Sequence, residues 1–271
     1  MNDLDAFARL VQALDPWRGQ LVFIGGWSHR LHTLHPQANP LGFQPVFTKD
    51  TDLAFHHQVP LEGDIKAALV RQGFEEQLSG DTRPPVAHYT LGNEADGFYA
   101  EFLTPLAGSG YKRNGQTDAT LLAGGISAQK IRHLDVLLTA PWVMPVGPAQ
   151  GVPLPAPVDL RVAHPVCFMV QKFLIKKQRT PDKHRQDLLY VFDTVQLFGH
   201  LLEQFATDWQ SVIAPSLDPG ARHTVVQECA ASFDTLTDAI RDAARIPQDR
   251  QVDPEELRAT CRYALGQILA F

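Results

Sequence analysis

The pattern of hydrophobic and polar positions changes near residue 163. Before this point, short apolar or alternating runs typical of strands are interspersed with helical stretches and with most of the glycines and prolines. After it, apolar residues recur almost everywhere with the period of a helix. The sequence therefore predicts an α+β protein, with a mixed sheet and flanking helices over residues 1–163 and a helical bundle over residues 164–271.

The first part begins with a predicted helix at residues 4–14, where the apolar positions share one face. Strands are predicted at residues 21–26, 51–57, 86–92 and 97–105, and helices at 27–35 and 62–73. The first strand, LVFIGG, ends in the glycine pair Gly25–Gly26. The expected order is thus strand, helix, strand, helix, and then strands that resemble a hairpin.

The second part begins with a helix after residue 164, because Pro165 suits a first helical turn. A second helix is predicted to start with Thr180 as N-cap and Pro181 at its first position, and to end near Gly199. Further helices are predicted at 201–213, 221–244 and 254–270.

Composition narrows the functional classes. The chain has 271 residues, of which 44% are hydrophobic, enough for one large domain or two modest ones. Its net charge of −6 argues against a surface that coats nucleic acid, although a local basic groove remains compatible with it. Three widely spaced cysteines suggest neither a disulfide framework nor a thiolate zinc site. We expect a reducing, cytoplasmic setting.

No membrane association is expected. The N-terminus is acidic and lacks the basic start and apolar core of a signal peptide. The longest uncharged stretch, residues 136–158, contains six prolines, which a spanning helix would not tolerate. We interpret this stretch as strand and loop.

The motif KDTD contains the first candidate chemistry. Asp50 and Asp52 are two residues apart in a predicted strand, so their carboxylates project from the same face. Carboxylate oxygens are ligands for a hard cation such as Mg²⁺, which commonly also binds substrate phosphates. The alternative is a solvent-facing strand edge.

Two further features lie near this motif. The glycine pair in IGGWS is predicted to join a strand to a helix, where backbone N–H groups can bind phosphate. Glu101 interrupts the apolar run FYAEFLTP, where an inward-facing charge would need a partner. The alternative for Glu101 is the polar face of an edge strand.

In this arrangement the chain resembles the nucleotidyltransferase superfamily with the DNA polymerase β-type fold. The matching residues are GGWS (25–28), DTD (50–52) and AEF (100–102), within about the first 105 residues. TKDTDLAF and AEFLTP also resemble stand-alone bacterial members that include the AbiEii-type toxins. Two departures are a longer gap between Gly26 and Asp50, which suggests an inserted loop over 35–47, and a glutamate where many members have aspartate.

The resemblance implies a nucleotidyltransferase-type sheet and transfer of a nucleoside monophosphate from an NTP, with ATP among the candidates. It assigns catalysis and metal binding, by Mg²⁺ or Mn²⁺, to Asp50, Asp52 and Glu101. Two metal ions would hold the triphosphate, and Glu101 could also help to take the acceptor's proton. Gly25, Gly26 and Ser28 would bind the triphosphate.

A basic segment follows residue 164. Lys172, Lys176 and Arg179 are spaced i, i+4 and i+7, so a continuous helix would place them on one face, and Lys183 adds to the group. The family resemblance extends into this segment and implies nucleotide binding by these four residues, in a helical domain that closes the nucleotide cleft. The alternative is a solvated helix face with Asp182 and Asp187 as local ion partners.

Two other features have competing interpretations. His29, His32 and His35 rotate round a helix, so surface or hydrogen-bonded histidines are favoured over a metal cluster, although His29 could face the phosphate pocket. The segment 105–118, with Tyr111, Lys112 and Arg113, fits either a mobile loop near the site or a plain surface loop.

The acceptor is left open by the sequence. A tRNA or protein acceptor is compatible with a toxin that has a separate antitoxin or partner protein. The alternatives are a nucleotidyltransferase of antibiotic-type small molecules, and a catalytically silent nucleotide-binding or interaction protein.

Overall fold

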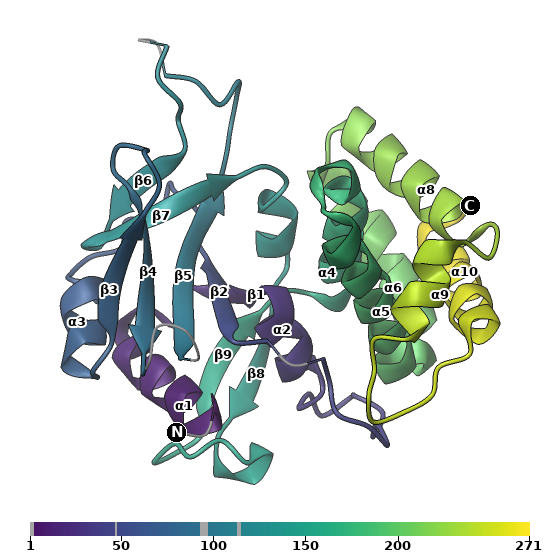
Figure 1. The fold of residues 1–271 in the computed structure, drawn as a ribbon, viewed down its shortest axis with the longest axis horizontal. Coiled ribbons are helices and arrows are strands. Elements are labelled where there is room, and N and C mark those ends of the chain that lie inside the picture. Colours follow the sequence, from purple (N-terminus) through teal and green to yellow (C-terminus); the bar gives the residue numbers. More distant parts are fainter. Residues whose placement is uncertain (1–2, 47, 93–96, 113–114) are drawn as a thin grey trace. The chain divides into compact units, whose positions relative to one another are not determined.

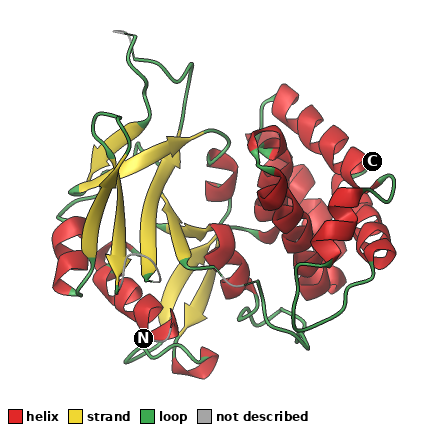
Figure 2. Ribbon diagram, viewed as in Figure 1, coloured by secondary structure: helices red, strands yellow, loops and turns green. Residues whose placement is uncertain are grey.

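The computed structural model describes residues 3–46, 48–92, 97–112 and 115–271. Its contacts divide the chain into two compact units. The sheet unit comprises Met1–Ser28 and Thr48–Ala163, and the helical unit comprises His29–Phe47 and His164–Phe271. Figure 2 shows the strands concentrated in the first unit and the helices dominating the second.

In the described residues of the sheet unit, nine strands form one mixed sheet. The main path runs β3-β4-β5-β2-β1-β9-β8, while β7 pairs with β5 and β6 (Figure 1). The pairs β2–β5, β1–β9 and β5–β7 are parallel and the others are antiparallel. The strands are β1 (Val22–Ile24), β2 (Asp50–Ala54), β3 (Glu75–Ser79), β4 (Val86–Leu91), β5 (Phe98–Pro105), β6 (Thr120–Ala123), β7 (Ile126–Ile131), β8 (Trp142–Val146) and β9 (Val158–Val162).

Among the described residues, three α-helices accompany this sheet: α1 (Asp3–Ala13), α2 (Gly25–His32), which continues into the helical unit, and α3 (Ile65–Arg71). The first core cluster is aromatic: Phe7 of α1 stacks on Trp27 with ring centroids 4.2 Å apart, and Trp27 meets Phe98 of β5 edge to face at 5.6 Å. α3 starts where the Asp64 carboxylate accepts a hydrogen bond from the Ala67 N–H at 2.8 Å. One face of the sheet is thus buried beneath α1 and α3.

The helical unit contains α4 (Pro165–Leu174), α5 (Pro181–Phe198), α6 (Leu202–Asp208), a π-helical turn at Trp209–Ile213, α7 (Ala214–Ser216), α8 (Pro219–Phe233), α9 (Asp238–Ala244) and α10 (Pro254–Leu269). α10 packs against α5, α6, α8 and α9, and it therefore forms the middle of the bundle. The predicted start of α5 is confirmed, because Thr180 caps the helix and Pro181 occupies its first turn.

The α+β class is confirmed, with a sheet in the first part and helices in the second. The single helix predicted at 221–244 is wrong, since α8 ends at Phe233 and α9 starts only at Asp238. Thr237 caps α9 by accepting a hydrogen bond from the Ile240 N–H at 3.3 Å, and this cap separates the two helices. The helical period continues across the break because the buried residues of both α8 and α9 are mostly spaced three or four positions apart.

The segment 35–47, predicted as an inserted loop, is grouped with the helical residues. Asn39 donates its backbone N–H to the Leu197 carbonyl at 2.8 Å, and the Gln44 N–H donates to Asp249 at 2.8 Å. The Arg250 guanidinium lies 3.2 Å from the Phe43 ring centroid. Domains at 1–163 and 164–271, and a cleft-closing role for the second, stay predictions.

Candidate active site

The two aspartates and the glutamate occupy neighbouring strands. β2 and β5 are parallel, with Asp52 opposite Glu101 and Asp50 opposite Tyr99. Paired residues in adjacent strands project from the same face, so Asp50, Asp52 and Glu101 share one face of the sheet. All three are half-buried, whereas Thr51 between the aspartates is fully buried. The fold therefore gathers the three predicted carboxylates into one patch.

This carboxylate face is opposite to the one covered by α1. Phe98, which contacts Trp27 in the aromatic core, is three residues before Glu101 and therefore projects from the other face of β5. Ala100 and Phe102, which flank Glu101, are buried on that core side. Alternation along one strand thus separates the core from the site.

Gly25 lies directly against the Asp52 carboxylate. β1 ends at Ile24, which pairs with Asp52, and α2 starts at the next residue, Gly25 (Figure 1). The backbone of Gly25 has φ +62°, and a Cβ added there would lie 2.1 Å from Asp52 Oδ2. Glycine is required here both by the backbone conformation and by the space that the carboxylate occupies.

The two other predicted triphosphate-binding residues differ in exposure. Gly26 is half-buried and follows Gly25 in the first turn of α2. Ser28 is fully buried one turn further on. The backbone N–H groups in the first turn of a helix lack partners within that helix, so those at the start of α2 are better candidates for a phosphate contact than the buried Ser28 hydroxyl.

The carboxylates create a strongly negative patch. Burial raises the pKa of Glu101, His88 acts to lower it and Asp50 adds to the increase. Burial and the charges of Asp50, Glu101 and Asp52 raise the pKa of Tyr99 to about 12. Among the described residues, no lysine or arginine forms an ion pair with Asp50 or Glu101.

The donor chemistry of this patch fits a hard divalent cation, because it consists of carboxylate oxygens. No group of three or more His, Cys, Asp or Glu side chains in the described part of the chain forms a ready metal cage. Mg²⁺ is usually held by one or two carboxylates together with substrate phosphates, so a complete protein cage is not what such a site requires. The three-carboxylate metal set stays a prediction.

The predicted basic helix face is wrong. α4 ends at Leu174, Lys176 lies in a 3₁₀ turn, and Arg179 has an extended backbone. The residue before a proline is kept out of the helical region, which fixes Thr180 as extended and ends the helical path before Pro181. The i, i+4, i+7 spacing therefore does not describe one helix.

Three of the basic residues pair with acids inside the helical unit. Lys172, only 6% exposed, lies 2.9 Å from Asp187 Oδ1. Arg179 binds both oxygens of Asp187, at 2.7 and 3.1 Å. Lys176 lies 3.0 Å from Glu228. These contacts neutralise most of the charge that the sequence offered for phosphate binding.

Lys183 differs from the other three. It is exposed, and within the described residues its side chain forms no ion pair. Its backbone N–H donates to the capping Thr180 hydroxyl at 3.5 Å. Its positive charge is therefore available to a ligand.

The two histidines of α2, His29 and His32, are buried. His29 is fully buried, and its two ring nitrogens have no hydrogen-bond partner. It packs against Tyr190 and Phe168, with ring centroids 5.0 and 6.0 Å away. Burial lowers the pKa of His29 well below its usual value, with His32, Lys172 and Arg250 adding to the effect. His29 thus departs from the surface or hydrogen-bonded state favoured for the three histidines, and its ring packs among aromatic side chains of the helical unit.

The segment 105–118 is described in part, and Arg113 lies outside the described residues. Tyr111 is 65% exposed and forms an isolated bridge with Thr117. The Lys112 N–H donates to the Gln116 carbonyl at 2.8 Å. Whether this segment touches a substrate stays a prediction.

The sequence reasoning did not select His88, Tyr99 or Gln77. In the structure His88 lies opposite Glu101, Gln77 lies opposite His88, and the rings of His88 and Tyr99 are 5.8 Å apart. The alternation in VAHYTL and FYAEFL already indicated that His88 and Tyr99 occupy polar faces of their strands. Only the register shows that these faces coincide.

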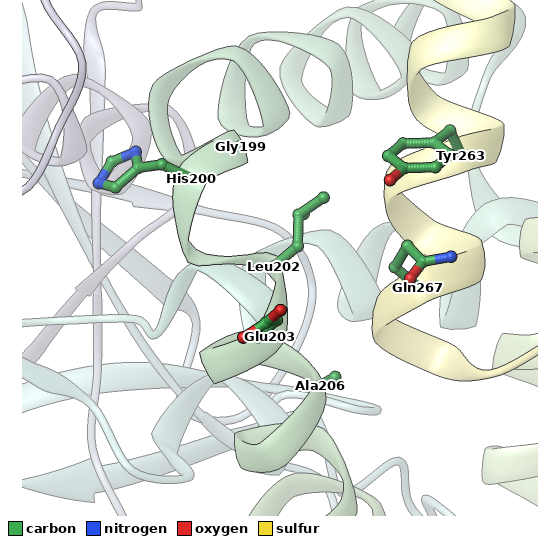
Figure 3. Close-up of a pocket in the computed structure, with 7 residues that line it drawn as sticks. All are labelled: Gly199, His200, Leu202, Glu203, Ala206, Tyr263 and Gln267. Atoms are coloured by element: carbon green, nitrogen blue, oxygen red, sulfur yellow. The ribbon is translucent and has the colours of Figure 1, made fainter.

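A separate hollow of about 310 Å³ lies in the helical unit (Figure 3). Tyr263 and Gln267 extend from α10 toward a segment that contains His200, Leu202 and Glu203. None of the residues that line this hollow was predicted to belong to the site. The lining residues are Gly199, His200, Leu202, Glu203, Ala206, Tyr263 and Gln267.

A comparison with known protein families shows to which family the chain belongs. A family model described as "Nucleotidyltransferase" matches residues 2–214, which include all of the sheet unit except its first residue, together with α4, α5 and α6. The chain belongs to the nucleotidyltransferase family. This nucleotidyltransferase matches no curated protein in a sequence search. In the described part of the chain, none of the helices has the length and apolar character needed to cross a membrane.

Proposed function

We propose that this nucleotidyltransferase moves a nucleoside monophosphate from an NTP to an acceptor in a metal-dependent reaction, with Asp50, Asp52 and Glu101 as its catalytic residues. The observation that carries the proposal is the parallel pairing of β2 with β5, which places these carboxylates on one face. The contact between Gly25 and Asp52 adds a helix start beside the acids. A triphosphate and its cation need both features together.

Asp50, Asp52 and Glu101 are the residues that would hold Mg²⁺ or Mn²⁺. When bound, such an ion would neutralise phosphate charge and lower the barrier to displacement. The three carboxylates would repel the phosphates of an NTP that carries no cation. Their positions therefore favour a cation-bound nucleotide over free NTP.

The N-terminus of α2 is the proposed triphosphate site. The backbone N–H groups of Gly25 and Gly26 can donate to phosphate oxygens, and the helix dipole adds favourable positive potential. Ser28 lies one turn further along α2 in a buried position, so it is a weaker candidate for a phosphate contact. In-line displacement depends mainly on such positioning.

Nucleotide binding by the basic segment is supported unequally. Lys183 is exposed and can reach a ligand without breaking an ion pair. Lys172, Lys176 and Arg179 would first have to give up or share their acidic partners. We therefore favour Lys183 as the phosphate contact, with the other three as weaker candidates.

We propose that the acceptor is an RNA such as tRNA or a protein. An enzyme that modifies such an acceptor fits a toxin that has a separate antitoxin. Modification of a small molecule and a silent nucleotide-binding protein are the competing outcomes. We also propose that the protein is bacterial and that it acts in the cytoplasm.

The test is incubation of the protein with each α-³²P-labelled NTP and Mg²⁺ or Mn²⁺, together with total RNA, total protein or a small-molecule extract. Label entering one fraction supports the proposal and names the acceptor class. The matched control is Asp50→Asn/Asp52→Asn, in which the transfer is expected to vanish. NTP binding without transfer to any fraction would instead support the silent protein.

A further inference from the structure

The carboxylate patch continues as a row across two more strands. Asp52 of β2 pairs with Glu101 of β5, Glu101 pairs with His88 of β4, and His88 pairs with Gln77 of β3. We call Gln77, His88, Glu101 and Asp52 the polar row. Cross-strand neighbours have side chains about 5 Å apart on one face, so the row is continuous.

The neighbouring residues show which face the row occupies. Tyr89, next to His88, donates its hydroxyl to Glu76 at 3.1 Å, and Glu76 also pairs with Lys66 of α3. Glu76 precedes Gln77 in β3. The α3 side of the sheet thus has its own hydrogen bonds, and Gln77 and His88 project from the opposite face together with Glu101.

His88 also lies near Tyr99, the residue that pairs with Asp50. Its ring centroid lies 5.8 Å from that of Tyr99, at an interplanar angle of 62°. Tyr99 pairs with Asp50 in the parallel register of β2 and β5. His88, Tyr99 and Gln77 are all half-buried, so none of the three side chains belongs to the fully buried core.

The row has a direction relative to the proposed triphosphate site. In the order β4-β5-β2-β1, Gly25 follows β1 on one side of Asp52, while Glu101 and His88 lie on the other (Figure 1). An in-line reaction requires the attacking oxygen and the leaving pyrophosphate on opposite sides of the α-phosphorus. With the phosphates at Gly25, the attacking group must come from the side of β5 and β4.

We propose that His88 and Gln77 form the acceptor subsite of this enzyme, and that they bind a hydroxyl-bearing acceptor through its uncharged polar groups. This inference rests on the proposed function. The acceptor oxygen bonds to the α-phosphorus as its proton passes to Glu101. The bond from the α-phosphorus to the bridging oxygen breaks, and pyrophosphate leaves with that electron pair.

The chemistry of the row favours a hydroxyl over a phosphate as the attacking group. Asp50, Asp52 and Glu101 would repel an acceptor phosphate that brings no cation of its own. Imidazole and amide groups both donate and accept hydrogen bonds, as do the uncharged groups around an alcohol. His88 and Gln77 position the acceptor, since Glu101 takes its proton and pyrophosphate leaves with the electron pair.

The experiment compares His88→Ala, His88→Gln and Gln77→Ala with wild type, and uses as probe whichever of total RNA, total protein or small-molecule extract the wild type labels from α-³²P-NTP. We expect the two alanine variants to raise the apparent KM for that fraction about tenfold, as one lost hydrogen bond predicts. The KM for NTP should change less than twofold. His88→Gln should restore part of the affinity, because it keeps a donor and an acceptor.

Gln58→Ala is the matched control, since Gln58 is an exposed residue of a loop in the same unit. An unchanged acceptor KM in both alanine variants, or a rise in the KM for NTP instead, would overturn the acceptor subsite while leaving the proposed function standing. If the wild type labels no fraction, the proposed function itself fails, and the subsite with it. Thermal melting of each variant establishes that it is folded.

Discussion

The two units of this protein both concentrate charged residues, but they use them differently. In the helical unit, Lys172 and Arg179 converge on Asp187, and Lys176 binds Glu228. In the sheet unit, Asp50 and Glu101 share a face and form no ion pair with any lysine or arginine in the described residues. Charges that pair with one another inside a unit serve its packing, whereas like charges gathered on one face of a sheet favour a ligand of opposite charge.

The largest expected effect is the loss of transfer in Asp52→Asn. Removing one carboxylate from a cation site costs several kcal/mol of transition-state stabilisation, and about 4 kcal/mol corresponds to a thousandfold slower reaction. The measurement is the single-turnover rate with α-³²P-NTP. Asp81→Asn, at an exposed loop position, is the control and should retain the wild-type rate. A similar rate in Asp52→Asn would remove the distinction between the two charge clusters.

Gly25→Ala should have the next largest effect. Its new Cβ would lie 2.1 Å from Asp52 Oδ2 and must displace that carboxylate, and the positive φ adds about 1 kcal/mol of strain. We expect transfer to fall about a hundredfold and the melting temperature to decrease modestly. Gly19→Ala is the control, because its added Cβ would meet no atom within 4 Å. Equal activity of the two variants would show that the glycine contact does not position Asp52.

In the helical unit the effect should be on stability. Asp187→Asn leaves the buried Lys172 ammonium without its carboxylate, which should lower the free energy of unfolding by about 3 kcal/mol. Asp182→Asn is the matched control, because its side chain is 89% exposed and its loss should cost less than about 1 kcal/mol. Urea unfolding measures both variants. Equal stability of the two would mean that the buried network contributes no more than a surface pair.

The same network predicts a pH dependence. Burial acts to raise the pKa of Asp187, but Lys172 and Arg179 outweigh it and hold the pKa below its usual value. A carboxyl whose pKa is lower in the folded state stabilises the fold above its unfolded pKa. Wild-type stability should therefore fall as the pH decreases below about 4, and Asp187→Asn should lack this component. Parallel stability profiles for the two proteins would contradict it.

The smallest effect is expected for Lys183→Ala. An exposed lysine contributes about 1 kcal/mol to binding at most, so the KM for NTP should rise no more than about fivefold. Lys177→Ala is the control, since Lys177 is 82% exposed and pairs with Glu228. A rise far larger in Lys183→Ala than predicted would place the basic segment in the active site and weaken the contrast between the units.

Local sequence patterns predicted much of the fold. Alternation around Asp50 and Asp52 and the pair Thr180–Pro181 each depend on a few consecutive residues, and the structure contains the corresponding strand and helix cap. The glycine pair does join a strand to a helix, but it forms the first turn of α2 rather than the end of the strand. What local patterns could not provide was strand register. His88 and Gln77 join the row only through pairings between β3, β4 and β5, which connect residues more than ten positions apart.

The prediction of a basic helix face was wrong for a related reason. Helical spacing from Lys172 to Arg179 assumed one continuous helix, but the restriction before Pro181 and the end of α4 at Leu174 interrupt it. The sequence also showed Asp187 as a possible local partner without indicating that it would be 3% exposed. Burial of that carboxylate depends on the packing of α4 and α5, and it is this burial that makes Lys172 and Arg179 structural partners.

The most direct test of the carboxylate site is calorimetric binding of Mn²⁺ together with a non-hydrolysable NTP analogue. We predict that wild type binds the analogue in a Mn²⁺-dependent manner and that Asp50→Asn/Asp52→Asn weakens this binding about a hundredfold, while Asp81→Asn does not. Equal Mn²⁺-dependent affinities in all three proteins would contradict the assignment of Asp50 and Asp52 as the site of the metal-bound nucleotide.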